Sequence, residues 1–426
     1  MSEQPIRVLM LARAVYPLHG FGGIERHVFH LVTHLARQDV DVTLVVGRPP
    51  DGTEEQQGLQ RILEAAQLTT QSLALRYLRY DLTSPLLRPN SILGRQINYP
   101  IFALREGRLA RQHLQAGRLD VVHSQGLCAF GFGWQRALHR SLRAVPFVAN
   151  PHGLEEYRTP DWRKRLAYTP FRGLYSWGHR RADRVIATDA CTQDDLPRYL
   201  RVPADRVVVI PSAIDVAECL GFVDERRRTE LRARFKLDEA DPVMLSVSRL
   251  ERNKGYHVLL DALALAQDAL GDRWRWLLVG QGKEAAVLEQ QAEQLGLSEH
   301  ITFVGKLDDQ ELHSLYEEVD LFVHPTLYEG SSLVTLEAMI HRLPVVASAA
   351  GGIPDKVFPG RNGLLVPPGD VHALAKALRT ALDLRSQWPH WGSEGVRIVE
   401  TSFAWPIVAK RTKQEYERML AKRRSP

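Results

Sequence analysis

Cysteine is scarce in this chain, with three residues in 426: Cys128, Cys191 and Cys219. An odd number cannot pair completely, and the spacing fits no metal-ligand motif. This excludes a disulfide-stapled fold, and we expect three structural thiols in a reducing cytoplasm.

Long apolar runs are also missing. No stretch approaches the roughly 18 consecutive apolar residues of a membrane-spanning helix. The first residues lack the basic, then apolar, then small-residue pattern of a secretory signal. We therefore expect a cytoplasmic protein.

The composition is that of a globular chain. Hydrophobic residues make up 44% and charged residues 25%, which excludes a disordered or fibrous protein. At about 150 residues per domain, the length favours two or three domains.

The net charge of +5 is unevenly distributed. Residues 1–210 contain 28 Lys and Arg against 19 Asp and Glu, whereas residues 211–426 contain 27 against 31. The basic half could face a membrane surface, a phosphorylated acceptor or nucleic acid. An equally open alternative is a solvated surface of arginine-rich composition, because Lys164 is the only lysine in that half.

Short apolar, β-branched runs alternate with helical patterns along the chain. We expect helices near 25–37, 257–269 and 283–295, and a last helix over Trp405–Arg424. This alternation predicts parallel sheets with right-handed crossovers. Eleven strands exceed one comfortable open sheet, so two doubly wound α/β domains are predicted. The strands are expected at 6–11, 42–46, 120–123, 146–149, 184–187, 207–210, 243–247, 276–279, 301–304, 321–323 and 345–347.

The seam between the domains is expected within 212–241, where periodicity is lost before a new strand begins. Residues 51–118 carry few strand signals and many arginines. We interpret them as loops and helices inserted in the first domain.

Glycines follow two of the expected strands, where ligands bind in open parallel sheets. Gly22 and Gly23 open a helix after the first strand, so backbone there could approach a diphosphate. A tight turn is the plainer interpretation. The dinucleotide-binding fingerprint is incomplete, because its third glycine is replaced by Glu25. A second pair, Gly280 and Gly282, also lies where a nucleotide could touch backbone.

Two cations bracket the loop after the strand at 243–247. Arg249 and Lys254 could neutralise a diphosphate leaving group without a metal. Loops with two cations are common, so this signal is weak by itself.

The stretch 328–339 is the most informative. Ser331 or Ser332 could cap a helix whose first free amides form an anion site. Glu329 and Glu337 flank that site, and carboxylates there favour binding of sugar or ribose hydroxyls. Glu337 could instead be a solvated helix residue. Its apolar neighbours argue for burial, which is costly unless the carboxylate is hydrogen-bonded.

Four elements occur in order: Gly22-Gly23-Ile24-Glu25, then Arg249 with Lys254-Gly255, then Glu329 with Glu337 eight residues later, then Asn362 to Asp370. Together they resemble the retaining glycosyltransferases of family four, which have the GT-B architecture. The similarity spans nearly the whole chain and is strongest over 243–378.

The resemblance implies two Rossmann-like domains facing each other across a cleft. Residues 1–218 would bind the acceptor, joined by a helix within 404–426 that crosses back to them. Residues 219–403 would bind the nucleotide-sugar.

The resemblance also implies residue roles. Arg249 and Lys254 would hold the diphosphate, Glu329 the sugar hydroxyls and Glu337 the ribose. Backbone amides of Gly23 and of Ser331, Ser332 and Leu333 would meet the phosphates. His152, in Pro151-His152-Gly153, matches a histidine near the exocyclic hydroxyl of the sugar, although a lone histidine after a strand is more often a structural hydrogen bonder.

Several positions depart from the family pattern. His341-Arg342 replaces a common small residue followed by glycine, and Ser331-Ser332 replaces an aromatic or small apolar residue followed by Gly or Pro. None removes a charge that the mechanism needs, but they leave the identity of the donor sugar open.

The expected function is retaining transfer of a hexose from a UDP- or GDP-sugar to an acceptor hydroxyl, in glycolipid, polysaccharide or small-glycoside biosynthesis. We expect no cofactor, no metal and no nucleic-acid partner. The Asp39-Val40-Asp41 sequence mimics a metal motif of another architecture, but its acids suit a turn or strand edge better. Contact of the basic half with the inner face of a membrane stays an open alternative.

Other functions fit parts of the pattern. A nucleotide-sugar epimerase or a sugar phosphorylase could use a similar scaffold, although no lysine motif for pyridoxal phosphate is evident. An NAD-dependent dehydrogenase would suit the glycine-rich turn but not the Glu-x7-Glu element. A non-catalytic protein for anionic lipid or nucleic acid would explain the basic half alone.

Overall fold

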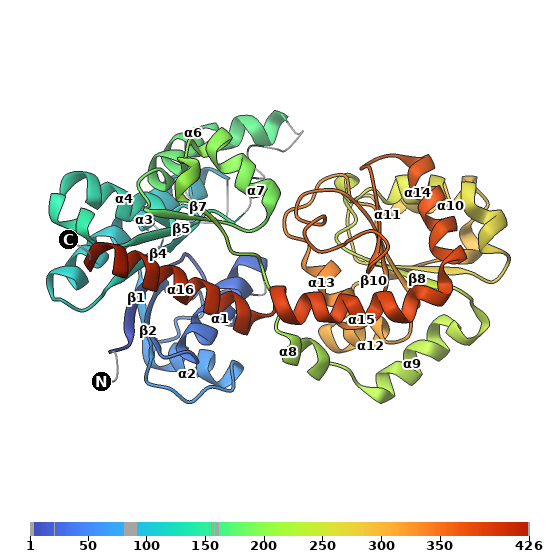
Figure 1. Ribbon diagram of the computed structural model, residues 1–426, viewed down its shortest axis with the longest axis horizontal. Helices are drawn as coiled ribbons and strands as arrows, with labels where there is room; N and C mark the ends of the chain where they lie inside the picture. Colours follow the sequence, from blue (N-terminus) through green and yellow to red (C-terminus); the bar gives the residue numbers. More distant parts are fainter. Residues whose placement is uncertain are drawn as a thin grey trace. The chain divides into compact units, whose positions relative to one another are not determined.

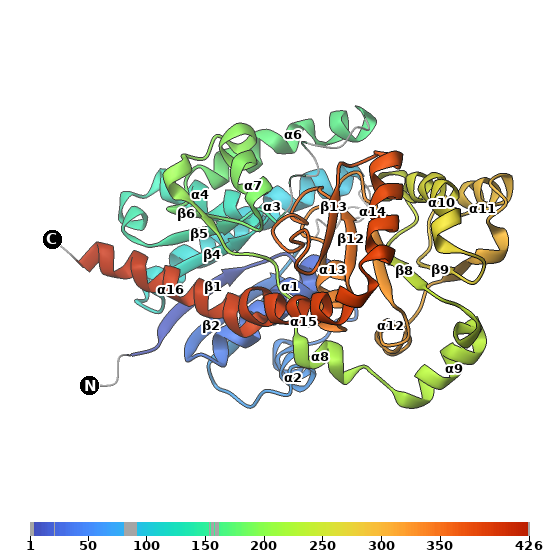
Figure 2. The ribbon, with the colours of Figure 1, turned by 45° about the vertical axis from the view of Figure 1, so that its right-hand side comes forward.

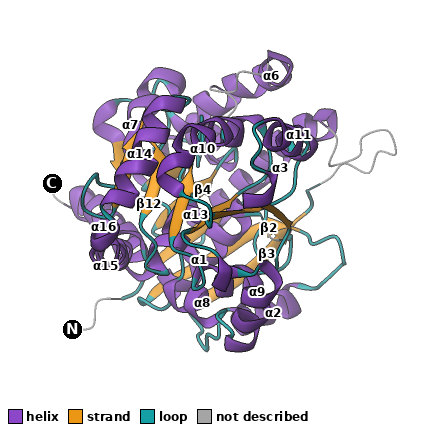
Figure 3. Ribbon diagram, turned by 90° about the vertical axis from the view of Figure 1, so that its right-hand side faces the viewer, coloured by secondary structure: helices purple, strands orange, loops and turns teal. Residues whose placement is uncertain are grey.

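The computed structural model describes residues 4–20, 22–80, 92–152, 154, 157 and 162–424. The chain divides into two compact units. Unit 1 comprises Met1–Pro211 and Trp405–Pro426, and unit 2 comprises Ser212–Ala404. Each unit has a parallel β-sheet with helices packed against it (Figure 1, Figure 3).

Unit 1 contains a seven-stranded sheet in the order β3-β2-β1-β4-β5-β6-β7. All its strand pairs are parallel. The chain order reverses between β1 and β4, which makes their carboxyl ends the expected place for a ligand. The strands are β1 Ile6–Leu11, β2 Val40–Gly47, β3 Leu73–Leu78, β4 Val121–Gln125, β5 Phe147–Asn150, β6 Arg184–Ala187 and β7 Val207–Val209.

The helices of unit 1 bury apolar side chains against this sheet; in α1, for example, Val28, Leu31, Val32 and Leu35 are fully or almost fully buried. Its α-helices are α1 Gly23–Ala36, α2 Glu55–Ala65, α3 Ile92–Gln115, α4 Cys128–Leu138, α6 Trp162–His179, α7 Ala190–Asp195 and α16 Trp405–Arg424.

Unit 2 contains a six-stranded parallel sheet in the order β10-β9-β8-β11-β12-β13. Its chain order reverses between β8 and β11. The strands are β8 Val243–Val247, β9 Arg275–Val279, β10 Ile301–Gly305, β11 Leu321–His324, β12 Val345–Ser348 and β13 Gly363–Val366. The α-helices are α8 Val216–Gly221, α9 Glu225–Phe235, α10 Tyr256–Leu270, α11 Ala285–Gln294, α12 Asp309–Tyr316, α13 Leu333–Ile340, α14 Val371–Asp383 and α15 Trp388–Ile398.

The predicted α/β class with two parallel sheets is confirmed, and all eleven predicted strands exist with ends shifted by at most two residues. Two strands were missed, β3 and β13. Both are edge strands, and β3 alternates buried and partly exposed residues instead of forming a continuous apolar run. The interpretation of 51–118 as loops and helices was therefore wrong at β3. Residues 81–91 of that segment, with Arg88, lie outside the described residues.

The predicted last helix is confirmed as α16, and it packs on unit 1 beside α1 (Figure 2). The Tyr416 hydroxyl and His123 Nδ1 are 2.6 Å apart, and Arg184 Nε donates to Glu415 at 2.6 Å. The indole of Trp405 stacks on His30 with ring centroids 5.6 Å apart. These contacts tie the end of the chain to a sheet formed by its first half.

A buried carboxyl lies between α3 and α4. Gly107 and Gly131 let these helices pack closely, since a Cβ on Gly131 would lie 1.6 Å from the carbonyl oxygen of Ala103. Glu106 is completely buried at this crossing. Burial raises the pKa of Glu106 well above its ordinary value of 4.5 and so favours the neutral form.

We expect Glu106 to make stability fall with rising pH. The contribution of its protonated form is complete below the unfolded-state pKa and is lost as the pH rises through the higher folded-state pKa. Thermal unfolding measured between about pH 5 and pH 9 should therefore decline less for Glu106→Gln than for the wild type. Glu417→Gln, at an exposed position on α16, is the control and should follow the wild type. Equal pH dependence of all three proteins would contradict the assignment.

Candidate functional site

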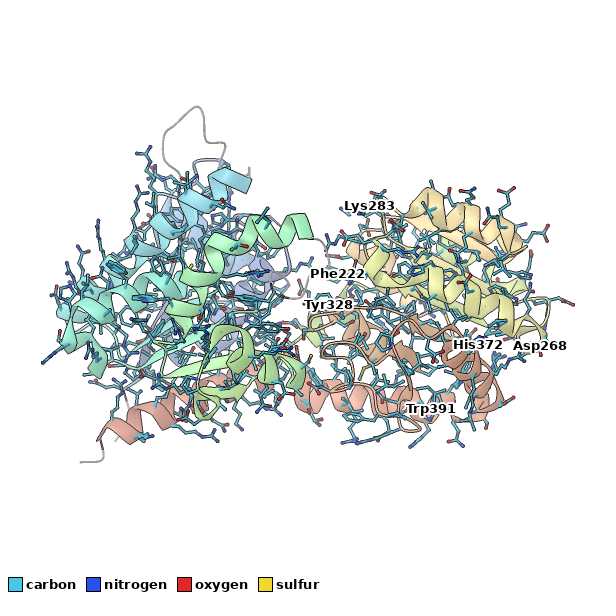
Figure 4. All side chains as sticks on the ribbon, turned by 90° about the horizontal axis from the view of Figure 1, so that it is seen from above. Phe222, Asp268, Lys283, Tyr328, His372 and Trp391 are labelled. Atoms are coloured by element: carbon cyan, nitrogen blue, oxygen red, sulfur yellow. The ribbon has the colours of Figure 1, made fainter. Side chains whose placement is uncertain are left out.

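A polar cluster of unit 2 lies where its sheet reverses order. The loop after β8 carries Arg249 and Lys254, and the loop after β11 carries Tyr328, labelled in Figure 4, and Glu329. Because β8 and β11 are neighbours, the two loops emerge side by side. The backbone N–H of Leu327 donates to the carbonyl of Asn253 at 2.8 Å, which joins them directly.

Glu329 is the centre of this cluster. One of its oxygens, Oε2, accepts from Lys254 Nζ at 2.8 Å and from His324 Nε2 at 3.0 Å. Burial by itself would raise the pKa of Glu329, but the hydrogen bond from His324 and the charge of Lys254 outweigh it and lower the pKa to about 2. Glu329 is therefore an ionised acceptor at neutral pH, and Lys254 is held beside it.

The structure thus brings together two of the predicted residues, Lys254 and Glu329. His324 was missed, although it stands at the end of a predicted strand, where the position itself was a signal. It is fully buried on β11, and its Nδ1 has no hydrogen-bond partner among the described residues.

Arg249 lies on the exposed side of the same loop. Its guanidinium donates to Glu251 Oε1 at 2.9 Å, and its side chain is 73% exposed. No described contact joins it to Glu329, so the two predicted cations have different surroundings.

The helix after Glu329 begins differently from the prediction. Ser332 occupies the cap position of α13, but its backbone is left-handed at φ 40° and its hydroxyl bonds Thr335 Oγ1 at 2.8 Å instead of a backbone amide. The prediction that a serine side chain caps α13 was therefore wrong, because the left-handed backbone directs the Ser332 hydroxyl toward Thr335. No described side chain caps α13, so the amides of its first turn, beginning with Leu333, are left for an anion.

A buried lysine, which the sequence interpretation missed, stabilises this turn by hydrogen bonds. Lys356 is completely buried, and its ammonium donates to the carbonyls of Ser331 and Gly352. It also lies 3.4 Å from Ser331 Oγ. A single lysine in a glycine-rich stretch gave no sequence signal that distinguished it from a surface residue.

Glycines allow the loops of this site to pack on one another. A Cβ on Gly280 would lie 1.8 Å from the carbonyl oxygen of Ser248, and one on Gly282 would lie 2.1 Å from that of Leu250. Glycine is therefore needed at both positions so that the loop that carries Arg249 can pack against them. Contact of either glycine with a donor stays a prediction. Gly351, at φ 54°, similarly clears the carbonyl oxygen of Glu329, which a Cβ would approach to 2.0 Å.

Glu337 is half-buried on the second turn of α13. The hydroxyl of Tyr316, on α12, lies 3.4 Å from Glu337 Oε2 and donates to it. Burial first, and then the nearby Glu337, raise the pKa of Tyr316 well above its ordinary value, so the phenol keeps its proton. Of the two interpretations of Glu337, a hydrogen-bonded glutamate therefore fits the structure better than a solvated one.

Histidines pack behind Tyr316 and explain an unusual position in the sequence. The His341 ring stacks on Tyr316 with centroids 5.3 Å apart and planes at 7°. Its Nδ1 donates to Glu317 Oε1 at 2.6 Å, and its Nε2 lies 2.8 Å from His313 Nδ1. A small residue at 341 would lose this network.

The predicted residues of unit 1 lie near one another. Gly22 precedes α1 and Gly23 is its first residue. A Cβ on Gly22 would lie 2.0 Å from Glu25 Oε2, whereas one on Gly23 would meet nothing within 4 Å. Gly23 therefore leaves open space at the start of α1.

His152 follows β5 with a left-handed backbone at φ 64°. Its backbone N–H donates to Asn150 Oδ1 at 2.9 Å, and its ring meets His27 of α1 edge-on at 4.7 Å. Burial chiefly lowers the pKa of His152 well below its ordinary value, so the ring is neutral. Its Nε2 is buried without a hydrogen-bond partner among the described residues, which exclude the neighbouring Gly153.

We expect Gly351→Ala to destabilise the protein more than Gly296→Ala. Both glycines have positive φ, 54° and 70°, so both substitutions cost about 1–2 kcal/mol in backbone conformation. Only the Cβ at 351 would also collide with backbone, at the carbonyl of Glu329. Chemical denaturation should show the larger loss for Gly351→Ala, and equal losses would argue against close packing at Glu329.

Comparisons with known proteins agree with this architecture. Residues 227–395 match the model for glycosyl transferases group 1, and residues 21–218 match that for glycosyltransferase family 4. Glycogen synthase of Mycobacterium tuberculosis is 29% identical over 98% of this chain and 95% of its own length. D-inositol 3-phosphate glycosyltransferase of Corynebacterium glutamicum is 26% identical over 98% and 97%.

Solved structures share the fold. Sucrose-phosphate synthase from Thermosynechococcus elongatus has a TM-score of 0.70 at 23% identity, covering 99% of this chain and 100% of that one. Anabaena HepE in complex with UDP has a TM-score of 0.69 at 20% identity, covering 97% and 100%. The two family models together span most of the sequence and the relatives nearly all of it, and they identify this chain as a glycosyltransferase of the family-four type with the GT-B fold.

Proposed function

We propose that this protein transfers a hexose from a UDP- or GDP-sugar to an acceptor hydroxyl, with retention of the anomeric configuration. The observation that carries the proposal is the cluster of Lys254, His324 and Glu329 beside the uncapped start of α13. It combines the ammonium of Lys254 and helix amides, which suit a diphosphate, with an ionised acceptor for sugar hydroxyls.

The donor sugar is assigned to Glu329. Because its carboxylate is ionised, it accepts hydrogen bonds from sugar hydroxyls and has no proton to donate. Among the described residues, its Oε1 makes only a 3.2 Å contact with the N–H of Gly330, an exposed interaction that leaves capacity for a ligand.

The diphosphate is assigned to Arg249, Lys254 and the amides of Ser331, Ser332 and Leu333. An ammonium has three donors, so Lys254 can keep its bond to Glu329 while it reaches a phosphate oxygen. Arg249 would exchange its exposed contact with Glu251 for the phosphate, which costs little because exposed ion pairs are weak.

In the transition state, the bond from the anomeric carbon to the phosphate oxygen breaks and negative charge grows on the diphosphate. The cations and amides stabilise that charge. The acceptor oxygen bonds to the same face of the sugar, and its proton passes to the departing phosphate oxygen. This front-face route uses no side-chain nucleophile.

The two units are assigned separate roles. Residues 219–403 would hold the donor, with Glu337 on the ribose, and residues 1–218 with 404–426 would hold the acceptor. Gly22 and Gly23 would approach the phosphates, and His152 Nε2 would meet the exocyclic hydroxyl of the sugar. The relatives include a glycogen synthase and an inositol 3-phosphate glycosyltransferase. The proposed acceptor is therefore a hydroxyl of a polysaccharide, a small glycoside or a glycolipid headgroup.

A thermal-shift panel of nucleoside diphosphate sugars tests the donor assignment. A donor at about 100 times its dissociation constant should stabilise the protein by about 2.7 kcal/mol. Proton NMR of the product should then show the donor's anomeric configuration. An inverted product would contradict the retaining mechanism, and an epimer formed without acceptor would favour an epimerase.

Arg249→Ala should lower kcat about 100-fold, because removal of one contact to developing charge costs about 2.7–4 kcal/mol. Arg252→Ala is the matched control, since Arg252 is exposed on the same loop and has no assigned role. Initial rates at saturating donor give kcat for both variants and for the wild type. Loss limited to a few-fold in Arg249→Ala would remove this residue from the phosphate site.

Tyr316→Phe should weaken nucleotide binding about 3- to 10-fold, because it removes a hydrogen bond that orients Glu337. Titration with nucleoside diphosphate separates this effect from chemistry, and kcat should stay near that of the wild type. Tyr199→Phe, on a partly buried tyrosine of unit 1, is the control. Unchanged affinity in Tyr316→Phe would show that Glu337 is oriented without this hydroxyl.

A further inference from the structure

The basic residues of unit 1 concentrate in one group of helices. The helices α3, α4 and α6 pack against one another, and η1 Arg140–Ala144 follows α4 (Figure 1). Residues 92–115, 128–144 and 162–182 contain thirteen lysine or arginine residues and a single acidic residue. That acid, Glu106, is fully buried and favours the neutral form. By sequence, these segments therefore contribute thirteen positive charges and no ionised acid of their own.

An apolar area lies within this basic surface. Trp134 and Leu138 are four residues apart on α4, so they share a helix face, and they are 42% and 61% exposed. The Trp134 ring packs against Trp177 of α6 with centroids 5.6 Å apart. The buried Phe130 packs against both rings, with centroids 6.0 and 5.6 Å away. These contacts hold the indoles, while Trp134 and Leu138 stay exposed to water.

Four arginines, here called the bordering arginines, follow the ends of these helices: Arg140 and Arg143 lie in η1 after Leu138, and Arg180 and Arg181 follow α6. The Arg181 guanidinium lies 3.4 Å from the ring centroid of Trp177. Burial, and then repulsion by the charges of Arg180 and Arg143, lower the pKa of Arg181. No carboxylate among the described residues pairs with any of the four, so the repulsion is uncompensated within the described structure.

An arginine-rich composition alone does not explain the pattern. In unit 2, Arg228 and Arg232 both bond Glu318, and Arg361 and Arg397 both bond Glu394. These four arginines of unit 2 are neutralised by neighbouring acids. The bordering arginines of unit 1 have no such partners among the described residues, and they belong to the same elements as the exposed apolar groups or directly follow them.

We propose that Trp134, Leu138 and Trp177, with Arg140, Arg143, Arg180 and Arg181 around them, form a docking surface for an anionic lipid bilayer. Tryptophan and leucine enter the interfacial layer of a bilayer, and arginines bind its phosphate groups. Nucleic acid fits less well, because bases need open aromatic faces. Here one indole packs against the other and Arg181 covers Trp177. The surface acts independently of the proposed donor chemistry.

Vesicle co-sedimentation tests the surface with the full chain. Vesicles of phosphatidylcholine with about one third phosphatidylglycerol should bind the protein, vesicles of phosphatidylcholine alone should bind it far less, and high salt should release it. Each bordering arginine should contribute about fivefold to the partition coefficient. The triple variant Arg140→Ser, Arg143→Ser and Arg180→Ser should therefore bind about 100-fold more weakly.

Matched variants separate the surface from net charge and general hydrophobicity. Serine at Arg118, Arg198 and Arg201 changes the charge equally at exposed sites of unit 1 outside the three helices, and should retain most binding. Trp134→Ser with Leu138→Ser should lower binding to anionic vesicles, whereas Leu265→Ser with Val287→Ser, at exposed sites of unit 2, should not. Circular dichroism and donor thermal shifts confirm that each variant is folded.

Three outcomes would overturn the proposal. One is absence of binding to anionic vesicles, and another is equal loss in the two triple-arginine variants. The third is binding of a fluorescent single-stranded oligonucleotide in preference to vesicles, which would assign the surface to nucleic acid.

Discussion

The Lys254–Glu329 ion pair is the constraint on which the site of unit 2 depends. Its partners are 75 residues apart in sequence and meet because β8 and β11 are neighbours in the sheet. Two buried charges are tolerated only when they are paired and hydrogen-bonded. His324 supplies a further hydrogen bond, and the missing Cβ of Gly351 lets the Glu329 backbone approach. The local geometry serves to keep one ionised carboxylate in place.

Buried charge has opposite consequences in the two units. In unit 2, Glu329 is ionised because Lys254 and His324 stabilise its charge more than burial disfavours it. In unit 1, burial dominates at Glu106, whose carboxyl favours the neutral form. A neutral Glu106 leaves α3, α4 and α6 with no ionised acid of their own. The ionised Glu329 thus offers a hydrogen-bond acceptor at the proposed ligand site, whereas the neutral Glu106 contributes no negative charge to its helices.

The fold was largely predictable because central parallel strands are buried on both faces and form continuous apolar runs. β1, β6 and β8 were predicted with their observed ends. β3 and β13 were missed because their apolar runs are weaker; the edge position does not explain the misses, since the edge strands β7 and β10 were predicted. Glu329 and Lys254 were found because both follow strands, where ligands gather in such sheets. Lys356 was not, because nothing local distinguishes a buried lysine from an exposed one.

The sequence by itself determined the class of fold, the places where strands end and the residue types there that suit a diphosphate and a sugar. These depend on periodicity and on order along the chain. Only the tertiary structure decided which charges meet: Lys254 bonds Glu329, whereas Arg249 bonds Glu251. It also turned the Ser332 hydroxyl away from the helix amides. The physical reason is that ion pairs and side-chain directions depend on neighbours brought together by strand order and on local backbone angles, which one-dimensional patterns do not contain.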